Sequence, residues 1–318
     1  MTRSVLVTGA AGYLGSLLVA DLAANPDRFE TIVGTDIREP DRVVDGVTFV
    51  NADVRDPGLV EVLRDHAVDV VVHLAAIVSP GKKPDRELKY SIDVGGTRNV
   101  LESSLAAGVS KIVVSSSGAA YGYYPDNPEW IDEDDEIRGN PEFAYSDHKR
   151  IVEEMLAEWR TEHPELKQLI FRSGTILGAG TRNQITDLFN RSIVFGIRGS
   201  ATPFVFIWDR DVVTCLRRGI ETDAVGVYNL AGDGAIPLRS IAAAMGKRYF
   251  EVPAGAVRAA LGGMKRLGMT QYGPEQVDFL RYRPVLSNRR LKEEFGYAPQ
   301  KTSQETFATF LEGRRDQT

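Results

Sequence analysis

The sequence predicts an α/β protein with a doubly wound parallel sheet, followed by a smaller C-terminal domain of mixed structure. Three observations predict this fold class. Short apolar runs alternate with helical patterns through the first half of the chain, the glycine-rich turn VTGAAGYLG (residues 7–15) joins the first run to the first helix, and the pattern loosens after Arg172. Continuous apolar strands that alternate with helices are typical of a parallel sheet covered on both faces.

The elements of the first half follow from these patterns in chain order. Strands are expected where apolar and β-branched residues run together, at residues 4–8, 31–35, 47–50, 68–74, 111–115 and 168–172. Helices are expected at residues 14–24, 58–66, 91–107 and 142–160, the third despite its two glycines. The first domain is therefore placed at residues 1–172.

Residues 173–318 are assigned to a second, substrate-binding domain. Gly, Pro and Arg become frequent there, and helices are expected at residues 185–195, 238–244, 275–279 and 288–295. Strands are expected at residues 204–207 and 226–229, and they are candidates to rejoin the first sheet. Residues 253–269 are rich in Ala, Leu, Gly and Met with three basic side chains, so we expect an apolar lid over the site; a helix lying on a membrane is the alternative.

Composition excludes several classes of function. The 318 residues are 43 % hydrophobic and 26 % charged with a net charge of -6, which is typical of a soluble globular protein and argues against a nucleic-acid partner. One cysteine, Cys215, excludes a disulfide framework, and the four histidines lack metal-ligand spacing, so no metal site is expected. The acidic stretch 129–136 is interpreted as a solvated loop. No signal-peptide or membrane-span pattern is present, so we expect a cytoplasmic protein without a membrane partner.

Gly9, Gly12 and Gly15 lie between the first strand and the first helix, the position of a dinucleotide fingerprint in a Rossmann domain. The first glycine would form the tight turn, the second would let the backbone approach a pyrophosphate, and the third would let the helix pack on the strand. Phosphates would bind at the helix N-terminus, where free N–H groups and the helix dipole favour negative charge. A purely structural glycine turn is the alternative.

Asp36 strengthens the dinucleotide interpretation. It ends the second strand, 21 residues after Gly15, close to the spacing of about 20 expected for a carboxylate that binds the adenosine ribose. Such a carboxylate repels a 2′-phosphate and so favours NAD, although nearby Arg38 keeps NADP open as an alternative. Asp53 follows the third strand and is a candidate to accept a hydrogen bond from the adenine amino group.

Tyr145 and Lys149 are four residues apart on a predicted helix and hence on one face. A tyrosine normally loses its proton near pH 10, and a neighbouring cation lowers that pKa, so we expect Lys149 to prepare Tyr145 as a base. Ser117 ends a run of three serines at the carboxyl end of a predicted strand, where ligands bind in open α/β sheets. It would hydrogen-bond a substrate oxygen; a Tyr–Lys pair on a solvated helix and serines that cap a strand are the alternatives.

The combination of VTGAAGYLG, Asp36, Asp53, HLAA (residues 73–76), SSSGAAYG (115–122) and YSDHK (145–149) resembles the extended short-chain dehydrogenase/reductase family. In particular, it is similar to NAD-dependent epimerase/dehydratases of the UDP-glucose 4-epimerase type. The resemblance covers residues 4–178 and is diffuse beyond them.

The resemblance implies a role for each of these groups. Tyr145 would be the acid/base, Lys149 would hold the cofactor ribose and adjust Tyr145, and Ser117 would orient the reacting oxygen. Cofactor contacts are also implied for Tyr13, Leu14, Val54, Leu74, Ala75, Ala76, Ser115 and Tyr145, in addition to Lys149, the three glycines and the two aspartates. A homodimer is also implied, paired through the helices at residues 91–107 and 146–159.

Three departures from the family pattern concern the substrate. Asp93 occupies a position where the family usually has Asn, and Thr175 follows the strand where an epimerase usually supplies an Asn to the substrate. The segment 204–211 resembles a family stretch that ends in Asp, but it lacks the Arg expected just before the stretch to hold a nucleotide phosphate. Thr175 and Arg283 are nevertheless the candidate substrate contacts besides Ser117 and Tyr145, Arg283 because it is placed like an arginine that grips pyrophosphate.

The residues therefore predict an enzyme that oxidises a secondary alcohol with NAD. Our first hypothesis is a nucleotide-sugar 4-epimerase that works through a transient ketone. A net dehydrogenase of a sugar, a steroid-like alcohol or another small hydroxyl compound is the second. A non-catalytic dinucleotide sensor is the third, and the complete Tyr–Lys–Ser set counts against it.

Overall fold

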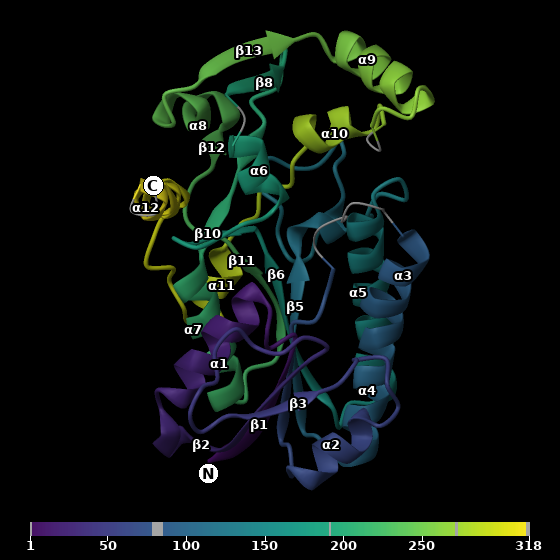
Figure 1. Ribbon diagram of the computed structural model, residues 1–318, viewed down its shortest axis with the longest axis vertical. Helices are drawn as coiled ribbons and strands as arrows, with labels where there is room; N and C mark the ends of the chain where they lie inside the picture. The colour runs from purple at the N-terminus through teal and green to yellow at the C-terminus, as the bar shows by residue number, and fades with distance from the viewer. Residues whose placement is uncertain (1, 78–84, 191, 271–272, 316–318) are drawn as a thin grey trace.

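A seven-stranded parallel sheet forms the centre of the molecule in the computed structural model, which describes residues 2–77, 85–190, 192–270 and 273–315 (Figure 1). The strands lie in the order β11-β6-β5-β4-β1-β2-β3, so the chain starts in the middle of the sheet and winds outward in both directions. Their bounds are Arg3–Thr8 (β1), Phe29–Asp36 (β2), Thr48–Asn51 (β3), Val70–His73 (β4), Lys111–Ser117 (β5), Lys167–Ser173 (β6) and Gly226–Leu230 (β11). The predicted α/β fold class is confirmed.

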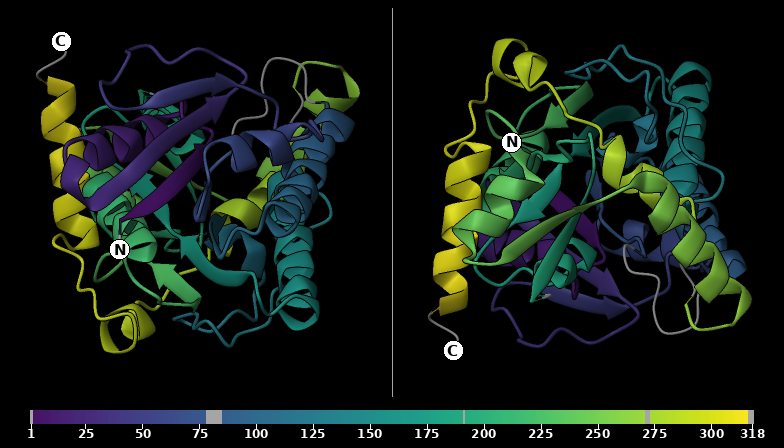
Figure 2. Two further views of the ribbon diagram at one scale, coloured as in Figure 1. Left: turned by 90° about the horizontal axis from the view of Figure 1, so that it is seen from below. Right: turned by 90° about the horizontal axis from the view of Figure 1, so that it is seen from above.

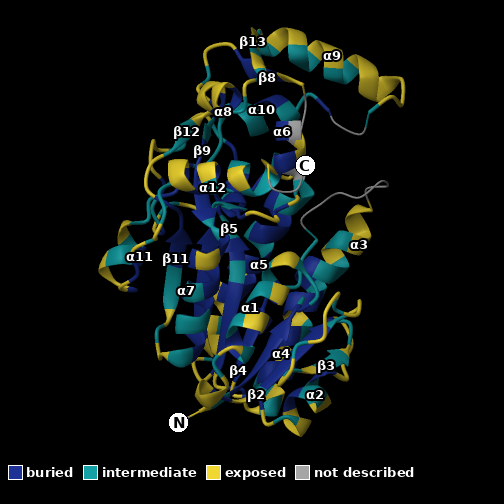
Figure 3. Ribbon diagram, turned by 60° about the vertical axis from the view of Figure 1, so that its left-hand side comes forward, coloured by how far each residue is buried: buried dark blue, intermediate teal, exposed yellow. Residues whose placement is uncertain are grey.

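Helices cover both faces of this sheet, which explains why its strands are apolar throughout. Alternate residues of a strand enter different cores: Val5 and Val7 pack against one set of helices, whereas Leu6 packs against the other. The first face carries α1 (Tyr13–Ala23), α7 (Asp209–Glu221) and α11 (Arg289–Glu293). The second face carries α2 (Leu59–Asp65), α4 (Gly96–Ala107) and α5 (Ala144–Glu162), and Figure 3 shows the buried strands between the two layers.

The remaining elements form a second layer of structure above the carboxyl ends of the strands (Figures 1 and 2). Three two-stranded sheets lie there, and an aromatic core that includes Phe189, Phe204, Phe206, Phe307 and Phe310 holds them together. The strands are β7 (Thr175–Leu177), β8 (Ile193–Ile197), β9 (Pro203–Phe204), β10 (Phe206–Trp208), β12 (Ile236–Pro237) and β13 (Arg248–Val252). The helices are α6 (Gln184–Asn190), α8 (Leu238–Ala244), α9 (Ala254–Arg266), α10 (Gln276–Arg281) and α12 (Ser303–Arg315).

Two predictions for the second half are wrong. The helix expected at residues 185–195 ends at Asn190, because Ile193, Val194 and Phe195 alternate between exposed and buried positions and pair with β13 instead. The strand expected at residues 204–207 is split into β9 and β10, and neither joins the central sheet. The strand at residues 226–229 does join it as β11, beside β6. The predicted division of the chain into two domains after residue 172 stays a prediction. The elements β11, α7 and α11 lie after that boundary in the sequence and yet pack in the central layers.

The helix expected at residues 91–107 has an irregular start. A short helix, α3 (Arg86–Tyr90), runs into a π-helical turn at Ser91–Gly95, and α4 continues from it. Such turns widen a helix locally and are frequent at functional sites. Here the turn brings the carboxylate of Asp93 into the interior, where only 5 % of the residue is exposed.

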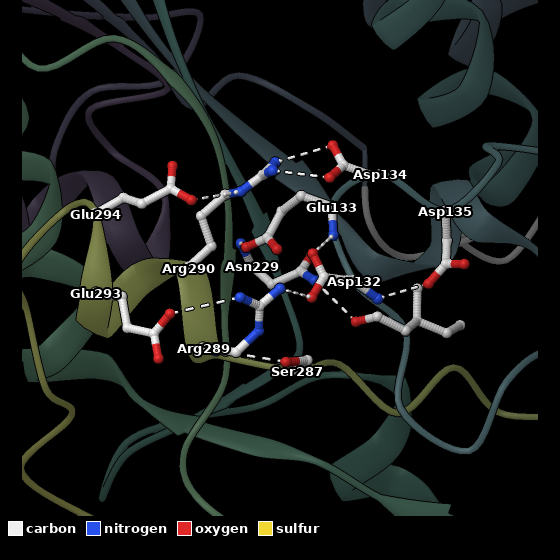
Figure 4. A network of polar contacts seen from close by, with 11 residues as sticks. Asp132, Glu133, Asp134, Asp135, Asn229, Ser287, Arg289, Arg290, Glu293 and Glu294 are labelled. Atoms are coloured by element: carbon white, nitrogen blue, oxygen red, sulfur yellow. Dashed lines mark hydrogen bonds and ion pairs between the residues drawn. The ribbon is translucent and has the colours of Figure 1, made fainter.

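The acidic stretch 129–136 is not a solvated loop throughout, which corrects the prediction. Ile131 is buried and pairs with Leu286, and Glu133 is 6 % exposed. The Glu133 Oε1 atom accepts a hydrogen bond from the backbone N–H of Asn229 at 2.7 Å. Figure 4 shows how Arg289 and Arg290 of α11 close over this segment through ion pairs with Asp132 and Asp134. The described residues contain no group of carboxylates, histidines or cysteines arranged to hold a metal ion.

Glu133 is expected to make the stability of the protein depend on pH. Burial raises the pKa of its carboxyl to about 7, from an ordinary 4.5, and the Asn229 N–H acts in the opposite direction. A raised folded-state pKa contributes stability below pH 4.5, and that contribution is lost as the pH rises toward 7. Glu133→Gln keeps the acceptor for Asn229 and cannot ionise. We expect it to be more stable than the native chain at about pH 8, by roughly 1 kcal/mol after solvent screening.

Urea unfolding at acid and alkaline pH measures this difference. Asp134→Asn is the matched control, because Asp134 lies in the same segment with an exposed side chain. Equal stability of native and Glu133→Gln protein across the whole range would contradict the assignment.

None of the described helices is long and apolar enough to cross a membrane.

Candidate active site

A cavity of about 410 Å³ opens at the carboxyl ends of the strands, between the central sheet and the layer above it. It is the place where open α/β sheets bind ligands. Many of the predicted site residues line it: Gly9, Gly12, Tyr13, Leu14, Gly15, Leu74, Ala76, Ser115, Ser117, Tyr145, Lys149, Thr175 and Arg283. Asp36, Asp53, Val54 and Ala75 are not part of its wall.

The glycine turn is built by close backbone contacts that side chains would prevent. Gly9 has a φ of +70°, and a Cβ on it would lie 2.8 Å from the backbone nitrogen of Ala75. A Cβ on Gly15 would lie 2.1 Å from the Gly9 carbonyl oxygen. Gly12 is the N-cap of α1 and offers no side-chain acceptor, so N–H groups at the start of the helix are open to a ligand. These features fit a pyrophosphate at this turn.

Asp36 ends β2 beside the glycine turn. Its Oδ2 atom accepts a hydrogen bond from Ala11 N–H at 3.2 Å, and its Oδ1 atom accepts one from Arg38 N–H at 3.1 Å. The Arg38 guanidinium lies 3.8 Å from the same carboxylate. The carboxylate is therefore fixed at the edge of the turn, in a position that fits hydrogen bonds to a ribose. It also lies beside the guanidinium of Arg38, the cation that would otherwise favour a 2′-phosphate.

Asp53 is engaged by a neighbour that the sequence analysis did not consider. The Arg55 guanidinium hydrogen-bonds its carboxylate at 2.6 Å, and this interaction lowers the pKa of Asp53 below its usual value. A contact between Asp53 and an adenine amino group stays a prediction and would have to share the carboxylate with Arg55.

Tyr145, Lys149 and Ser117 come together at the inner end of the cavity. The Ser117 hydroxyl lies close enough to the Tyr145 phenol to oppose the rise of its pKa, and the Lys149 Nζ atom lies 5.9 Å from the centre of the tyrosine ring. Lys149 donates a hydrogen bond to the Ser115 carbonyl oxygen at 3.0 Å. The helix α5 thus presents the phenol and the ammonium on one face, toward the end of β5.

The pKa of Tyr145 differs from the expected direction. Burial raises it above the usual value, the Ser117 hydrogen bond acts in the opposite direction, and the negative charge of Asp93 raises it further. Lys149 does not produce the predicted lowering in the protein alone. Burial lowers the pKa of Lys149, which Asp93 and Glu153 oppose. A cationic ligand beside Tyr145 would favour its phenolate.

A buried ion pair behind the site was not predicted. The Glu153 carboxylate lies two turns after Tyr145 on α5 and forms a two-pronged pair with the Arg172 guanidinium, with contacts of 2.9–3.1 Å. The Ser116 hydroxyl donates to the same carboxylate at 2.5 Å. This pair fixes α5 against β5 and β6. The sequence predicts the apolar face of α5 from the spacing of its apolar residues. It does not indicate that Glu153 lies on the buried side of the helix or that Arg172 is its partner.

The cavity also has an aromatic wall, and the guanidinium of Arg283 lies beside it. Phe143 and Phe279 stack with their ring centres 5.3 Å apart, and Tyr123 lies against both. Arg283 lies over the Phe279 ring at 4.9 Å, and its Nη2 atom is 3.5 Å from the Thr175 hydroxyl. Its Nε and Nη1 atoms are shielded from solvent without a hydrogen-bond partner among the described residues. A guanidinium in this state is prepared for an anion.

The predicted lid lies elsewhere. Within the described chain, α9 contributes no residue to the cavity wall, and its side chains are largely exposed (Figure 3). The wall comes instead from α10, through Phe279, and from Arg283 just beyond it. The ion pair between Arg258 of α9 and Asp278 of α10 joins the two helices. The expectation that residues 253–269 cover the site directly is therefore wrong.

Gly15→Ala is expected to remove cofactor binding, because the added Cβ forces α1 away from the Gly9 carbonyl. We expect NAD affinity to fall at least about 100-fold, which corresponds to roughly 2.7 kcal/mol. Isothermal titration calorimetry with NAD measures the loss. Gly263→Ala in α9 is the matched control, because nothing lies within 4 Å of its Cβ position. Unchanged NAD affinity in Gly15→Ala would place the dinucleotide elsewhere.

Comparisons of the sequence and of the structure with known proteins agree on one family. The model of the NAD-dependent epimerase/dehydratase family matches residues 5–231. An uncharacterised protein of Mycobacterium tuberculosis is 27 % identical and covers 98 % of this chain and 84 % of its own length. The UDP-glucose 4-epimerase of Thermotoga maritima, solved with UDP-glucose, has a TM-score of 0.77 at 19 % identity over 99 % of both chains. That of Thermus thermophilus, solved with NAD, has a TM-score of 0.76 at 24 % identity over 99 % of this chain and 100 % of its own.

Proposed function

The chain belongs to the NAD-dependent epimerase/dehydratase family, and from that membership we propose that it is a nucleotide-sugar 4-epimerase. It is an NAD-dependent enzyme, and its glycine turn and Asp36 fit this cofactor. The observation that carries the proposal is a single cavity that joins three features: the glycine turn, the Tyr145–Ser117 pair and the unpaired nitrogens of Arg283. Solved neighbours with this fold bind NAD or UDP-glucose.

The proposed chemistry divides the work between the cofactor and three side chains. Bound NAD supplies a reversible hydride acceptor. Tyr145 accepts the proton of the substrate hydroxyl and returns it after the resulting ketone has turned over in the site. Ser117 donates a hydrogen bond to the reacting oxygen, and Lys149 binds the ribose with its ammonium group held by the Ser115 carbonyl. No net redox change results.

Arg283 would bind the negative charge of the substrate. The cavity wall carries the cations Lys149, Arg182 and Arg283, and none of the described lining residues is a carboxylate. Such a wall favours two sets of phosphates, one from the cofactor and one from a nucleotide sugar. The base or sugar ring would then lie against Tyr123, Phe143 and Phe279.

The aromatic wall also favours a second candidate, a net dehydrogenase of an alcohol with an apolar body. Phe143, Phe279, Ile176 and Val205 offer more apolar surface than a sugar hydroxyl group needs. In this case the ketone would leave as product. Thr175, in place of an epimerase Asn, agrees with either candidate because its hydroxyl is engaged by Arg283.

We further propose a cytoplasmic homodimer paired through residues 91–107 and 146–159. The position of α4 and α5 on one outer face of the sheet supports it (Figure 2). Analytical ultracentrifugation of the purified protein tests the oligomeric state.

Tyr145→Phe is expected to lower the turnover number roughly 100- to 10,000-fold while NAD affinity stays unchanged, because only the proton-carrying oxygen is lost. The assay follows product stereochemistry by NMR beside nicotinamide absorbance, with UDP-glucose, UDP-galactose and apolar secondary alcohols. Tyr249→Phe, in β13, is the matched control. Inverted sugar without NADH supports the epimerase, whereas accumulating NADH supports the dehydrogenase. Full activity in Tyr145→Phe would contradict both.

Arg283→Met is expected to raise KM for a nucleotide sugar about 10- to 100-fold with a smaller effect on the turnover number, since the charge pair is made in the bound ground state. Steady-state kinetics measure the two parameters separately. Arg258→Met, which removes a cation on α9 outside the cavity, is the control. Equal KM values in the two variants would remove Arg283 from the substrate site.

A further inference from the structure

Asp93 and His148 form a buried acid–imidazole pair immediately behind the catalytic helix face. The His148 Nδ1 atom lies 3.0 Å from the Asp93 Oδ2 atom, and the two residues are 1 % and 5 % exposed. Because a carboxylate can only accept, Nδ1 carries the proton of this hydrogen bond. The other carboxylate oxygen accepts the backbone N–H of Ile77 at 2.9 Å. The pair therefore joins the π turn, the segment after β4 and α5.

The position of the pair in the chain is what connects it to the reaction. His148 lies between Tyr145 and Lys149 on α5, and Ile77 directly follows Leu74, Ala75 and Ala76 at the cofactor side of the cavity. Any displacement of this pair therefore moves the catalytic helix relative to the strand end that faces the cofactor.

The charge of Asp93 reaches groups on each element packed against it. It raises the pKa of Tyr145 and opposes the burial that lowers the pKa of Lys149, both on α5. It also opposes the burial that lowers the pKa of Lys89 on α3 and the burial that lowers the pKa of His73 on β4 to about 3. The Tyr90 ring packs edge-on against His148 at 5.5 Å, and the His148 Nε2 atom is buried without a partner among the described residues.

We propose that Asp93 and His148 are positioning residues that hold the catalytic helix on the cofactor side of the cavity and place a fixed negative charge behind Tyr145 and Lys149. This inference rests on the proposed function for its catalytic meaning. The charge keeps the phenol protonated and the ammonium charged until a cationic nicotinamide ring lies beside them. Asparagine at position 93 would preserve the shape and the Ile77 contact and would remove this control.

Asp93→Asn isolates the charge from the geometry. Tyrosine labelled at the ring carbon Cζ reports ionisation by NMR, and Tyr145→Phe assigns the signal. With NAD present and circular dichroism as the folding check, the titration runs from about pH 6 to about pH 11. We expect Tyr145 to ionise about one pH unit lower in Asp93→Asn than in the native chain. Asp93→Ser, which also lacks the charge, should show the same direction and serves if Asp93→Asn does not fold.

Two further variants separate this role from simple stabilisation. Asp147→Asn is the matched control: Asp147 also joins α5 to α3, through Arg86, and the midpoint for Tyr145 should not move. His148→Gln keeps a hydrogen-bond donor to Asp93 and should also leave the midpoint in place.

Equal midpoints in the native chain and the charge-removing variants would overturn the proposal, as would a Tyr145 signal that stays protonated in them throughout. The same holds if Asp147→Asn shifts the midpoint equally. The titration needs no substrate, so its result is independent of the proposed function. Absence of turnover with every nucleotide sugar would refute the proposed function without changing the outcome of the titration.

Discussion

The register between β5 and α5 is the interaction on which the rest of the site depends. Three consecutive serines at the end of β5 each meet one residue of a single helix face: the Ser117 hydroxyl meets Tyr145, the Ser115 carbonyl accepts from Lys149, and the Ser116 hydroxyl donates to Glu153. The three helix residues are four positions apart and therefore lie on one face of α5, where they contact three consecutive residues of the strand. A shift of one residue would separate all three contacts together. The geometry of the candidate site is thus a consequence of strand–helix packing and not of a local loop conformation.

Through the same packing of β5 and α5, residues from the later part of the chain also stabilise the site. Arg172 of β6 pairs with Glu153 and also donates to the Tyr121 hydroxyl at 2.8 Å, and Tyr121 in turn donates to the Asn229 side chain of β11 at 2.9 Å. Asn229 N–H is then satisfied by Glu133. Arg172, Tyr121 and Asn229 each bond to a partner on a different element, which reduces the penalty for burying them. The strand β11 therefore supports the candidate site although it lies far along the sequence.

Sequence reasoning succeeded where one residue type at one spacing requires one backbone geometry. Gly9 and Gly15 could be placed because no other residue permits those contacts, and the sheet could be predicted because its strands are apolar on both faces. It failed where the deciding partner is distant in sequence. The strand β8 forms because β13 offers an edge more than 50 residues later, and Glu133 is buried because Asn229 needs an acceptor. The direction of the Tyr145 pKa was missed for the same reason, since Asp93 and the depth of burial are set by folding.

The distribution of charge explains how such a buried site can work. Cations line the cavity, whereas the carboxylates of Asp93 and Glu153 lie one layer behind it, against His148 and Arg172. Without ligands the cavity is positive and Tyr145 is held neutral by burial. In the proposed nucleotide-sugar epimerase, the phosphates of the dinucleotide and of the substrate would bind these cations, and the nicotinamide would supply a positive charge near the phenol. In that proposed enzyme the cationic ring would favour the phenolate beside the substrate hydroxyl, so ionisation of the base would be coupled to cofactor binding.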